Sequence, residues 1–176
     1  MIKGKLVGLR AVEAEDLILL RDWRNIASLR RNFREFRELS MMNQETWYSK
    51  ISNSPNDFMF VIERLDDQQL LGACGLLYVN WIIRSADYSF YIGYKDAYID
   101  EEGYAEEASR LLINYGFGNL NLNKMWMELY EFDEKKINFF MGKFPFERDG
   151  VLRQNCFEDG RYYDSLIISL LRKDYK

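Results

Sequence analysis

Residues 90–119 are the stretch of this 176-residue sequence whose types and spacing point most directly to chemistry. Residues 90–94 are typical of an apolar strand, and after a polar loop Gly103-Tyr104-Ala105 opens a run with helical period. A strand that enters a helix through a glycine turn leaves backbone N–H groups unpaired at the positive end of the helix dipole. These donors predict an anion site, commonly for phosphate. The alternative is an ordinary strand–turn–helix in which Gly103 serves only the turn.

Histidine is absent from the sequence, which removes several kinds of active site from consideration. A Ser-His-Asp triad, a Cys-His nucleophile pair and the commonest zinc ligand are excluded. Acid–base chemistry must therefore come from carboxylates, tyrosine, cysteine, lysine, backbone groups or water. Cys74 and Cys156 lie far apart in apolar, strand-like runs, where we expect buried free thiols rather than a disulfide. No metal site is expected.

Charge is distributed unevenly along the chain. The net charge of −4 argues against nucleic acid as the main partner, since nucleic acid is recognised by basic surfaces. Six arginines nevertheless crowd residues 21–37 of the first quarter: Arg21, Arg24, Arg30, Arg31, Arg34 and Arg37. Residues 30–37 have two interpretations. They form either a solvated basic loop held down by Phe33 and Phe36, or a lid whose arginines meet an acidic substrate or phosphates.

Length and composition predict one globular domain over residues 1–176. Hydrophobic residues make up 48% of the chain and aromatic residues 16%, so a sizeable core is available. No apolar run approaches the roughly 18 residues that cross a membrane. The first residues carry no signal-peptide core. We therefore expect a cytoplasmic protein that is not bound to a membrane.

The strands that must position the candidate residues follow from alternating apolar residues and turn signals. Seven strands are predicted, over residues 5–12, 58–65, 70–81, 87–94, 124–131, 146–157 and 162–171. Asp159-Gly160 predicts a tight hairpin turn between the last two.

Helical spacing predicts the remaining elements. Helices are expected after Glu13, briefly within residues 26–40, from an Asn43 cap, from Ala105 to a stop at Gly116 and Gly118, and from an Asp133 cap. With the strands, this order predicts a single α/β domain in which helices cover both faces of a mixed sheet.

Short motifs follow one another along nearly the whole chain: Leu9-Arg10-Ala11, Glu15-Asp16-Leu17, Trp23-Arg24-Asn25, Ile83-Arg84-Ser85-Ala86-Asp87-Tyr88, Gly103-Tyr104-Ala105-Glu106-Glu107-Ala108, Asp149-Gly150-Val151-Leu152-Arg153 and Asp159-Gly160-Arg161-Tyr162-Tyr163-Asp164. In this order they resemble the GNAT acetyltransferase superfamily, especially its branch of ribosomal-protein, spermidine and amino-sugar N-acetyltransferases. The resemblance implies a single-domain GNAT-like fold. Its mixed, mostly antiparallel sheet would have about seven strands and a V-shaped cofactor cleft.

The resemblance also implies acetyl-CoA as co-substrate, lying in the V between the strands at 87–94 and 124–131. Backbone groups of Ile92, Gly93 and Tyr94 would hold the pantetheine arm. The helix from Asp133, with Lys136, would flank the far side of the cofactor and place Phe140 near the thioester.

The loop at residues 100–105 would wrap the pyrophosphate with Glu102, Gly103, Tyr104 and Ala105, because Gly103 permits close backbone approach and Ala105 is small. The family's loop usually begins with Gln or Arg and often carries a basic residue, whereas this chain has Asp100, Glu101 and Glu102. Each carboxylate would repel a pyrophosphate by about 1 kcal/mol if unscreened. They either point into solvent while the N–H groups bind, or weaken and reshape the site.

A second departure concerns the leaving group. Many members carry a tyrosine that protonates the departing thiolate, and the matching position here holds Phe140, with Pro145 in place of a later glycine. The implied reaction is direct attack of an amine on the thioester carbonyl, with a strand N–H stabilising the oxyanion.

Catalytic candidates come from the two strands of the V. Asp87 and Glu128 are candidates for the base, and Tyr130, Tyr91 or a water for the proton donor. The alternative is that the two carboxylates merely pair with arginines and that the tyrosines are half-buried strand residues.

The acceptor is expected to be a small-molecule primary amine that meets Trp23, Arg24, Asn25 and Arg34. Carboxylates at the site suit a polyamine, whereas the arginine segment suits an amino-sugar nucleotide, and a protein N-terminus is a further possibility. The rival function is a CoA-binding protein with little or no turnover. Tyr162, Tyr163 and Leu170 on the C-terminal hairpin predict an edge for a homodimer.

Overall fold

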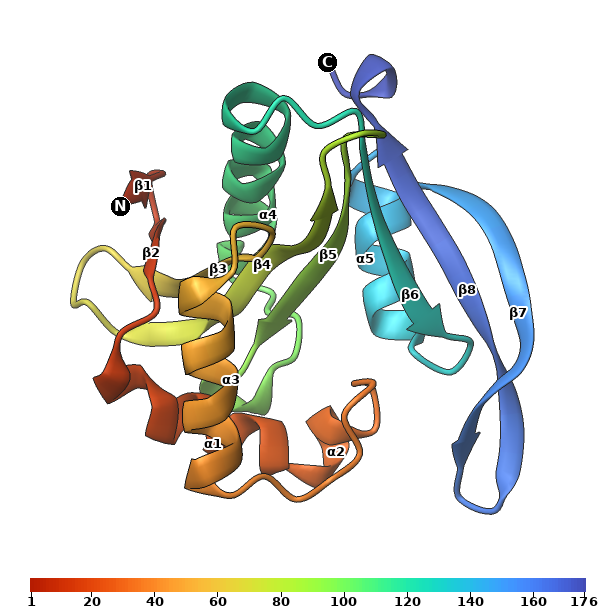
Figure 1. The fold of residues 1–176 in the computed structure, drawn as a ribbon, viewed down its shortest axis with the longest axis horizontal. Helices are drawn as coiled ribbons and strands as arrows, with labels where there is room; N and C mark the ends of the chain where they lie inside the picture. Colours follow the sequence, from red (N-terminus) through yellow and green to blue (C-terminus); the bar gives the residue numbers. More distant parts are fainter.

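The computed structural model describes all 176 residues, and eight strands form one sheet in the order β1-β2-β3-β4-β5-β6-β8-β7 (Figure 1). The strands are β1 (Ile2–Lys3), β2 (Val7–Ala11), β3 (Phe58–Arg64), β4 (Leu70–Asn80), β5 (Ser85–Ile92), β6 (Lys124–Tyr130), β7 (Glu147–Glu158) and β8 (Arg161–Leu171). All neighbours pair antiparallel except β5 and β6, which are parallel. The mixed, mostly antiparallel sheet is thus confirmed, and the two-residue β1 adds one strand to the seven expected.

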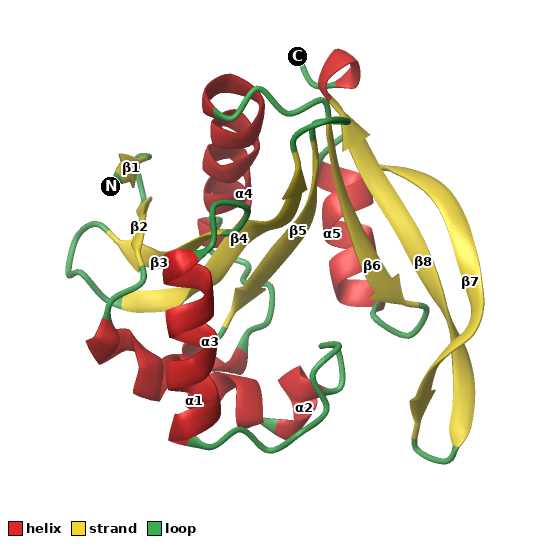
Figure 2. Cartoon of the chain, in the orientation of Figure 1, coloured by secondary structure: helices red, strands yellow, loops and turns green.

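Five α-helices cover the sheet: α1 (Leu17–Asn25), α2 (Ala27–Arg30), α3 (Met41–Asn53), α4 (Tyr104–Asn114) and α5 (Glu134–Lys143). In Figure 2, α1 and α3 lie on one side of the central strands and α4 and α5 on the other. None of these helices has both the length and the apolarity needed to span a lipid bilayer.

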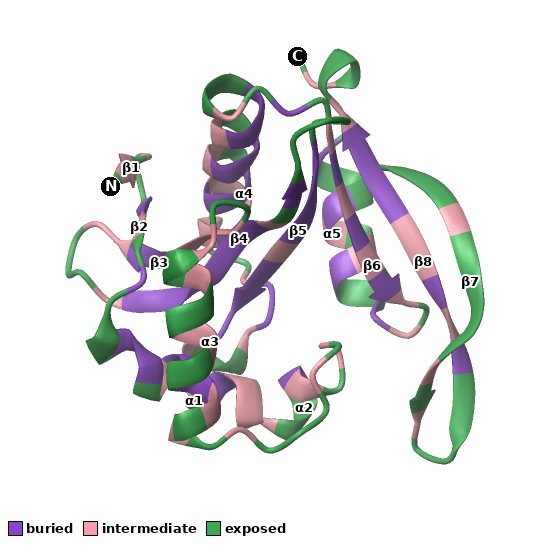
Figure 3. Ribbon diagram, viewed as in Figure 1, coloured by how far each residue is buried: buried purple, intermediate pink, exposed green.

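The alternation of β5 decides which side chains meet which helices. Ser89 and Tyr91 face the cavity beneath α1 and α3, whereas the rings of Tyr88 and Phe90 pack on Phe140 of α5 at 5.4 and 5.9 Å between centroids. Both faces of β5 are therefore buried, as Figure 3 shows by its nearly continuous purple colour. One core of 36 buried hydrophobic residues results.

The sheet splits at β5 and β6, and this split makes the V-shaped opening. The two strands pair only from Ser85 with Lys124 to Asp87 with Trp126. Beyond this point β5 continues beside β4 to Ile92, while β6 continues beside β8 to Tyr130 (Figure 1). Two arms therefore diverge from a common root, and side chains at the root and along the arms face a shared space.

Two helix ends differ from the sequence-based expectation. Ser40, not Asn43, caps α3, because the two residues form a reciprocal capping box in which each side chain accepts from the other's backbone N–H, at 3.2 and 3.0 Å. The chain after α4 does not stop at Gly116 but continues as a π-turn over Tyr115–Asn119. A Cβ at Gly116 would lie 2.3 Å from the end of Met125, so the glycine serves close packing rather than termination.

The structure also tests the predicted helix cap at Asp133, the hairpin turn at Asp159-Gly160 and the state of the two cysteines. Asp133 caps α5, and Asp159 and Gly160 both have positive φ, as the predicted tight hairpin turn requires. Both cysteines are free thiols. Cys74 is fully buried, but Cys156 is only partly buried because it lies on the outer strand β7, which has no further strand beside it.

Candidate active site

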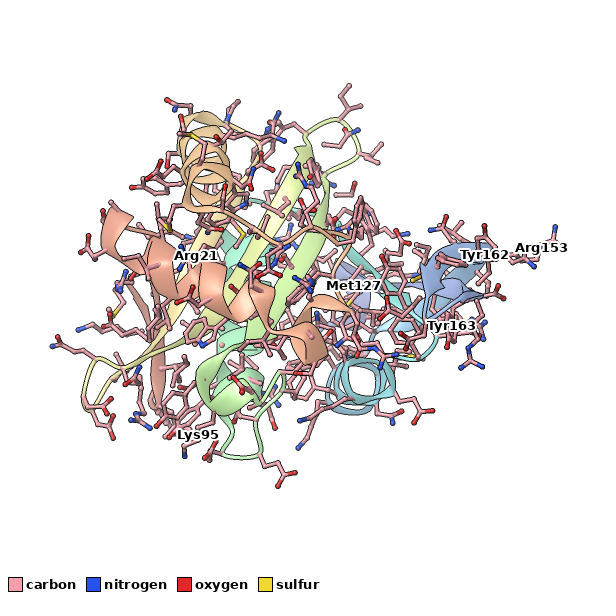
Figure 4. All side chains as sticks on the ribbon, turned by 90° about the horizontal axis from the view of Figure 1, so that it is seen from below. Arg21, Lys95, Met127, Arg153, Tyr162 and Tyr163 are labelled. Carbon is pink, nitrogen blue, oxygen red and sulfur yellow. The ribbon has the colours of Figure 1, made fainter.

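The V-shaped opening between β5 and β6 is called the fork below. A cavity of about 410 Å³ opens there. It gathers residues from both arms, from α1, from the loop after α2 and from α5, among them Arg24, Arg34, Asp87, Glu128, Tyr130 and Lys136. Met127 of β6 also lines it and is labelled near the middle of Figure 4. All three predicted catalytic residues are therefore brought together, with two of the four predicted substrate-binding residues.

Asp87 stands at the root of the fork, where its carboxylate is almost fully buried and receives a hydrogen bond from the guanidinium of Arg34. Burial raises the pKa of Asp87, and the Arg34 charge only partly opposes this. A buried carboxylate with a raised pKa is a stronger base than an exposed one. The pairing that sequence reasoning offered as the alternative to catalysis is present, and it involves one of the predicted substrate-binding arginines.

Glu128 and Tyr130 extend along the other arm of the fork. The carboxylate of Glu128 accepts a hydrogen bond of 2.7 Å from Asn155 of β7, which also donates to the Ser165 hydroxyl at 3.0 Å. Burial raises the pKa of Tyr130 to about 12, so the phenol holds its proton firmly at neutral pH. This wall is therefore kept in place by the C-terminal hairpin.

The arginine-rich loop lies across the cavity. Asn25 ties it to α1 by accepting from the Leu39 N–H and donating to the Leu39 carbonyl, at 2.8 and 2.9 Å. Phe33 packs edge-on against Tyr91 and Tyr98. The contact of Arg34 with Asp87 favours a lid over the cavity rather than a solvated basic loop. Arg37 is exposed and pairs with Glu35.

Arg24 contributes a partly buried cation to the same wall. Its guanidinium lies 4.5 Å from the centre of the Phe33 ring, and its Nε is buried without a hydrogen-bond partner. Trp23 is instead packed in the core, with its ring against Gly93, where a Cβ would lie 2.0 Å away. Trp23 and Asn25, both predicted to meet the substrate, thus support the wall rather than line it.

The start of α4 carries an internal anion. Gly103 caps the helix in the left-handed region, with φ of 95°. The carboxylate of Asp100 accepts from the N–H of Tyr104 at 2.9 Å and of Ala105 at 2.6 Å. These N–H groups are two of the donors that the sequence assigns to a pyrophosphate. Asp100 therefore points inward and occupies these donors, which agrees with the expectation of a reshaped site and not with an acid that faces solvent.

The neighbouring acids of this loop face solvent. Glu101 and Glu102 are exposed, and Glu102 lies 3.6 Å from the ammonium of Lys95. Ala105 is fully buried, and the Tyr104 ring lies beside the guanidinium of Arg64, as does that of Tyr94. Asp100 is therefore the one acid of this loop that contacts the N–H groups at the helix start.

The far end of β5 already has backbone partners. Ile92 exchanges both of its main-chain hydrogen bonds with Tyr98, and the Gly93 N–H donates to the Leu71 carbonyl at 2.8 Å. The placement of a pantetheine arm on Ile92 and Gly93 stays a prediction, and it requires the Tyr98 segment to move from Ile92.

The start of α5 closes the back of the fork. Asp133 accepts the Tyr98 hydroxyl and the Lys136 N–H, and burial raises the pKa of its carboxyl group. Phe140 is fully buried among aromatic rings and does not line the cavity, whereas Lys136, one turn earlier, does. No cluster of three or more Cys, Asp and Glu side chains is placed to hold a metal ion.

Comparison with known proteins identifies the fold and the family. The Acetyltransferase (GNAT) domain family matches residues 9–167. The chain belongs to this family. The resemblance drawn from short motifs is thereby confirmed, and the chain is an N-acetyltransferase by family and fold.

Named relatives of this GNAT domain cover nearly its full length. Spermidine N(1)-acetyltransferase of Escherichia coli K12 is 27% identical over 169 residues, which is 96% of this chain and 88% of the relative. The same enzyme of Vibrio cholerae is 26% identical over 95% of this chain and 94% of its own length. A crystal structure of the Vibrio cholerae enzyme in complex with CoA and spermine superposes with a TM-score of 0.81, at 27% identity, over 97% of this chain and 98% of that one.

Several residues of the GNAT site were not singled out by sequence reasoning. Glu35 lines the cavity, and the hydrogen bond from Arg37 lowers its pKa to about 2. Tyr98 bridges β5 to α5 through the Asp133 carboxylate. The sequence gives one signal that Asp100 accepts from the N–H groups at the start of α4, which is its place four residues before Tyr104. No local pattern marks Glu35 or Tyr98.

Proposed function

We propose that this GNAT domain transfers an acetyl group from acetyl-CoA directly to a primary amine of a small molecule, with polyamines as preferred acceptors. The observation that carries the proposal is that Asp87 and Glu128, one from each arm of the fork, line the same cavity. A polyamine needs a base at its reacting nitrogen and anionic partners for its other ammonium groups, and Glu35 adds a third carboxylate. The spermidine acetyltransferase relatives support this substrate class.

In this proposal Asp87 removes a proton from the amine, directly or through water. Its raised pKa brings the carboxylate closer to the operating pH, which is where a general base is most effective. Arg34 must release Asp87 first, because its guanidinium now occupies a hydrogen-bonding position on this carboxylate. The loop that carries Arg34 therefore opens to admit the acceptor.

Acetyl-CoA supplies the acetyl group as a thioester, and the residues present fit it with one exception. The N–H groups at the start of α4 are built to hold an anion, since a carboxylate already occupies two of them, and the amides of Gly103 and Glu106 have no partner. Asp100 is the exception, because its own charge must withdraw or be tolerated when a pyrophosphate binds.

An acceptor that carries an anionic group is the second candidate. It is favoured by Arg24, whose Nε is buried on the cavity wall without a partner. An amine attached to a phosphate or carboxylate, such as an amino-sugar nucleotide, would satisfy it.

Thiol release from acetyl-CoA with a matched panel of amines distinguishes these functions. The panel holds spermidine, spermine, an amino-sugar nucleotide and a peptide with a free N-terminus. We expect the highest kcat/KM with the polyamines; preference for the nucleotide, lost in Arg24→Met, would establish the second candidate instead. A rise of melting temperature with CoA but no release with any amine would identify a binding protein without turnover.

We further propose a cytoplasmic homodimer that pairs through the β7–β8 hairpin. This hairpin projects from the rest of the chain, and Tyr162 and Arg153 are labelled on its outer side in Figure 4. Its exposed apolar side chains are Val151, Leu152, Phe157 and Tyr162, whereas Tyr163 and Leu170, which were also expected at this edge, are buried. Sedimentation velocity should give a dimer for the natural chain and a monomer for Phe157→Glu/Tyr162→Glu. A natural chain that is monomeric at micromolar concentration contradicts the proposal.

A further inference from the structure

Lys136 is a buried cation that has no anionic partner. The residue is 7% exposed, in the first turn of α5, and its side chain lines the cavity at the fork. No hydrogen bond or ion pair engages its Nζ. The adjacent Lys135 differs in both respects, since it is exposed and donates to the Ala97 carbonyl at 2.7 Å. The ammonium of Lys136 is therefore free to act on something inside the cavity.

The surroundings of Lys136 explain why it is unpaired. The Nζ lies 4.9 Å from the centre of the Tyr98 ring, which is a weak partner for a cation. Asp133, the nearest carboxylate on its own helix, is engaged by the Tyr98 hydroxyl and the Lys136 main-chain N–H. Burying an ammonium without an ion pair is costly. The buried position of Lys136 is therefore better explained by a reacting group in the cavity that gains negative charge.

Lys136 lies one helical turn from Phe140, the position that lacks the proton-donating tyrosine of many family members. Lys136 and Phe140 are four residues apart and share one face of α5. The Phe140 ring is enclosed by Tyr88, Phe90 and Phe146 and has no hydroxyl. Lys136 therefore supplies the only exchangeable proton on this face of α5 that reaches the cavity.

We propose that Lys136 is the proton donor to the sulfur that leaves during acetyl transfer, and so a further catalytic residue of this site. This inference rests on the proposed function. The amine nitrogen bonds to the carbonyl carbon, the carbon–sulfur bond breaks, and its electron pair goes to sulfur. Lys136 gives its Nζ proton to that sulfur and regains one of the two protons that the ammonium substrate releases. The other proton passes to solvent, so one proton is set free in each turnover.

The acidity of Lys136 suits this role better than that of the nearby phenols. Burial lowers its pKa to about 8, although Asp133 and Asp87 oppose this. A thiol ionises near 8.5, so transfer to a thiolate is nearly balanced. Tyr91 and Tyr130 have pKa values raised to about 12 by burial, which makes them weaker donors. The titratable and charged groups around Lys136 are Asp133 and Tyr98 beside it, Asp87 of β5, Arg24 of α1 and Arg34 of the lid loop.

The kinetic test compares Lys136→Met with Lys135→Met, the same substitution one residue earlier. For Lys136→Met we expect kcat to fall by about 100-fold or more, with the KM for acetyl-CoA changed by less than about threefold. The alkaline limb of the kcat–pH profile should disappear. Lys136→Arg keeps the charge but does not release its proton, and should stay as slow as Lys136→Met. Lys135→Met should resemble the natural enzyme.

A second readout needs no turnover. Lys136 in the intact protein should react with an amine-directed reagent half-maximally near pH 8, as followed by peptide mass spectrometry. CoA should slow this reaction. A midpoint above pH 10 would overturn the assignment.

The outcomes separate the two proposals. If the natural chain releases no thiol with any amine, the proposed function fails. If it is active and Lys136→Met keeps both its kcat and its alkaline limb, or Lys136→Arg restores full activity, the role of Lys136 as proton donor is wrong while acetyl transfer stands.

Discussion

At the scale of single residues, Asp100 is the side chain that most changes the view of the cofactor site. It supplies a negative charge to the N–H groups of Tyr104 and Ala105, which the sequence assigns to a pyrophosphate. The same contact has two effects. It stabilises the start of α4 by charge and hydrogen bonding, and it opposes a second anion at the same donors. The start of α4 is thus an anion-binding site whose donors are occupied by a carboxylate of the same chain.

We predict that Asp100→Asn strengthens the binding of CoA. The neutral amide removes a repulsion on the order of 1 kcal/mol, which corresponds to roughly a fivefold to tenfold lower Kd. The matched control is Glu101→Gln, which removes the same charge from an exposed side chain that does not touch the helix start. Isothermal titration calorimetry should show a small effect for Glu101→Gln. Weaker binding by Asp100→Asn would mean that the carboxylate orients the loop for CoA instead of competing with it.

At the scale of elements, the position of α4 depends on contacts that join distant parts of the chain. The Glu107 carboxylate accepts from the N–H groups of Lys5, Leu6 and Val7, at 2.8, 2.6 and 2.8 Å. Burial alone would raise the pKa of Glu107, but these donors outweigh it and the pKa is lowered. Gly4 permits this approach, since a Cβ there would lie 2.6 Å from the carboxyl group. The N-terminal segment therefore holds α4, and with it the anion-binding helix start, against the sheet.

Replacing Glu107 by alanine should destabilise the fold by about 2 kcal/mol, because three backbone donors lose a charged acceptor. The control is Glu106→Ala, whose partly exposed carboxylate pairs with Arg110 and Lys143 and should contribute at most about 1 kcal/mol. Urea unfolding curves of the two variants give both free energies of unfolding. Equal stability losses would show that the Glu107 contacts are replaced by water.

Helices and strands were predicted from the sequence more accurately than the side-chain contacts between distant residues. Periodicity and turn residues located every strand except the two-residue β1, because those patterns are local. The divergence of the two strands that carry Asp87 and Glu128 was expected from the resemblance to the GNAT superfamily, not from a local pattern. The partner of Asp87 is Arg34, 53 residues away, and the donors to Glu107 lie about 100 residues away. Such pairs depend on the final path of loops, including the positive φ of Lys95, Asp96 and Tyr98 that brings Tyr98 back onto Ile92.

At the scale of the whole molecule, the cost of keeping Lys136 inside the fork should be visible in stability. Its pKa falls from the ordinary 10.5 to about 8 on folding, because burial disfavours the charged form. Between these values the unfolded chain binds the Lys136 proton and the folded chain does not. Since stability rises with pH wherever the unfolded state binds more protons, Lys136 destabilises the fold below pH 8, and this penalty is relieved as pH rises toward 10.5.

We therefore predict that Lys136→Met is more stable than the natural chain at pH 7, and that the difference shrinks by roughly 3 kcal/mol by pH 10.5. Other groups that titrate in this range, such as the buried tyrosines, are common to both proteins, so comparing the two isolates Lys136. Urea unfolding at pH 7, 8, 9 and 10.5 provides the measurement, and Lys135→Met, with its exposed side chain, should run parallel to the natural chain. Parallel curves for Lys136→Met as well would mean that Lys136 keeps an ordinary pKa in the fold, which would also remove the basis for its acidity in acetyl transfer.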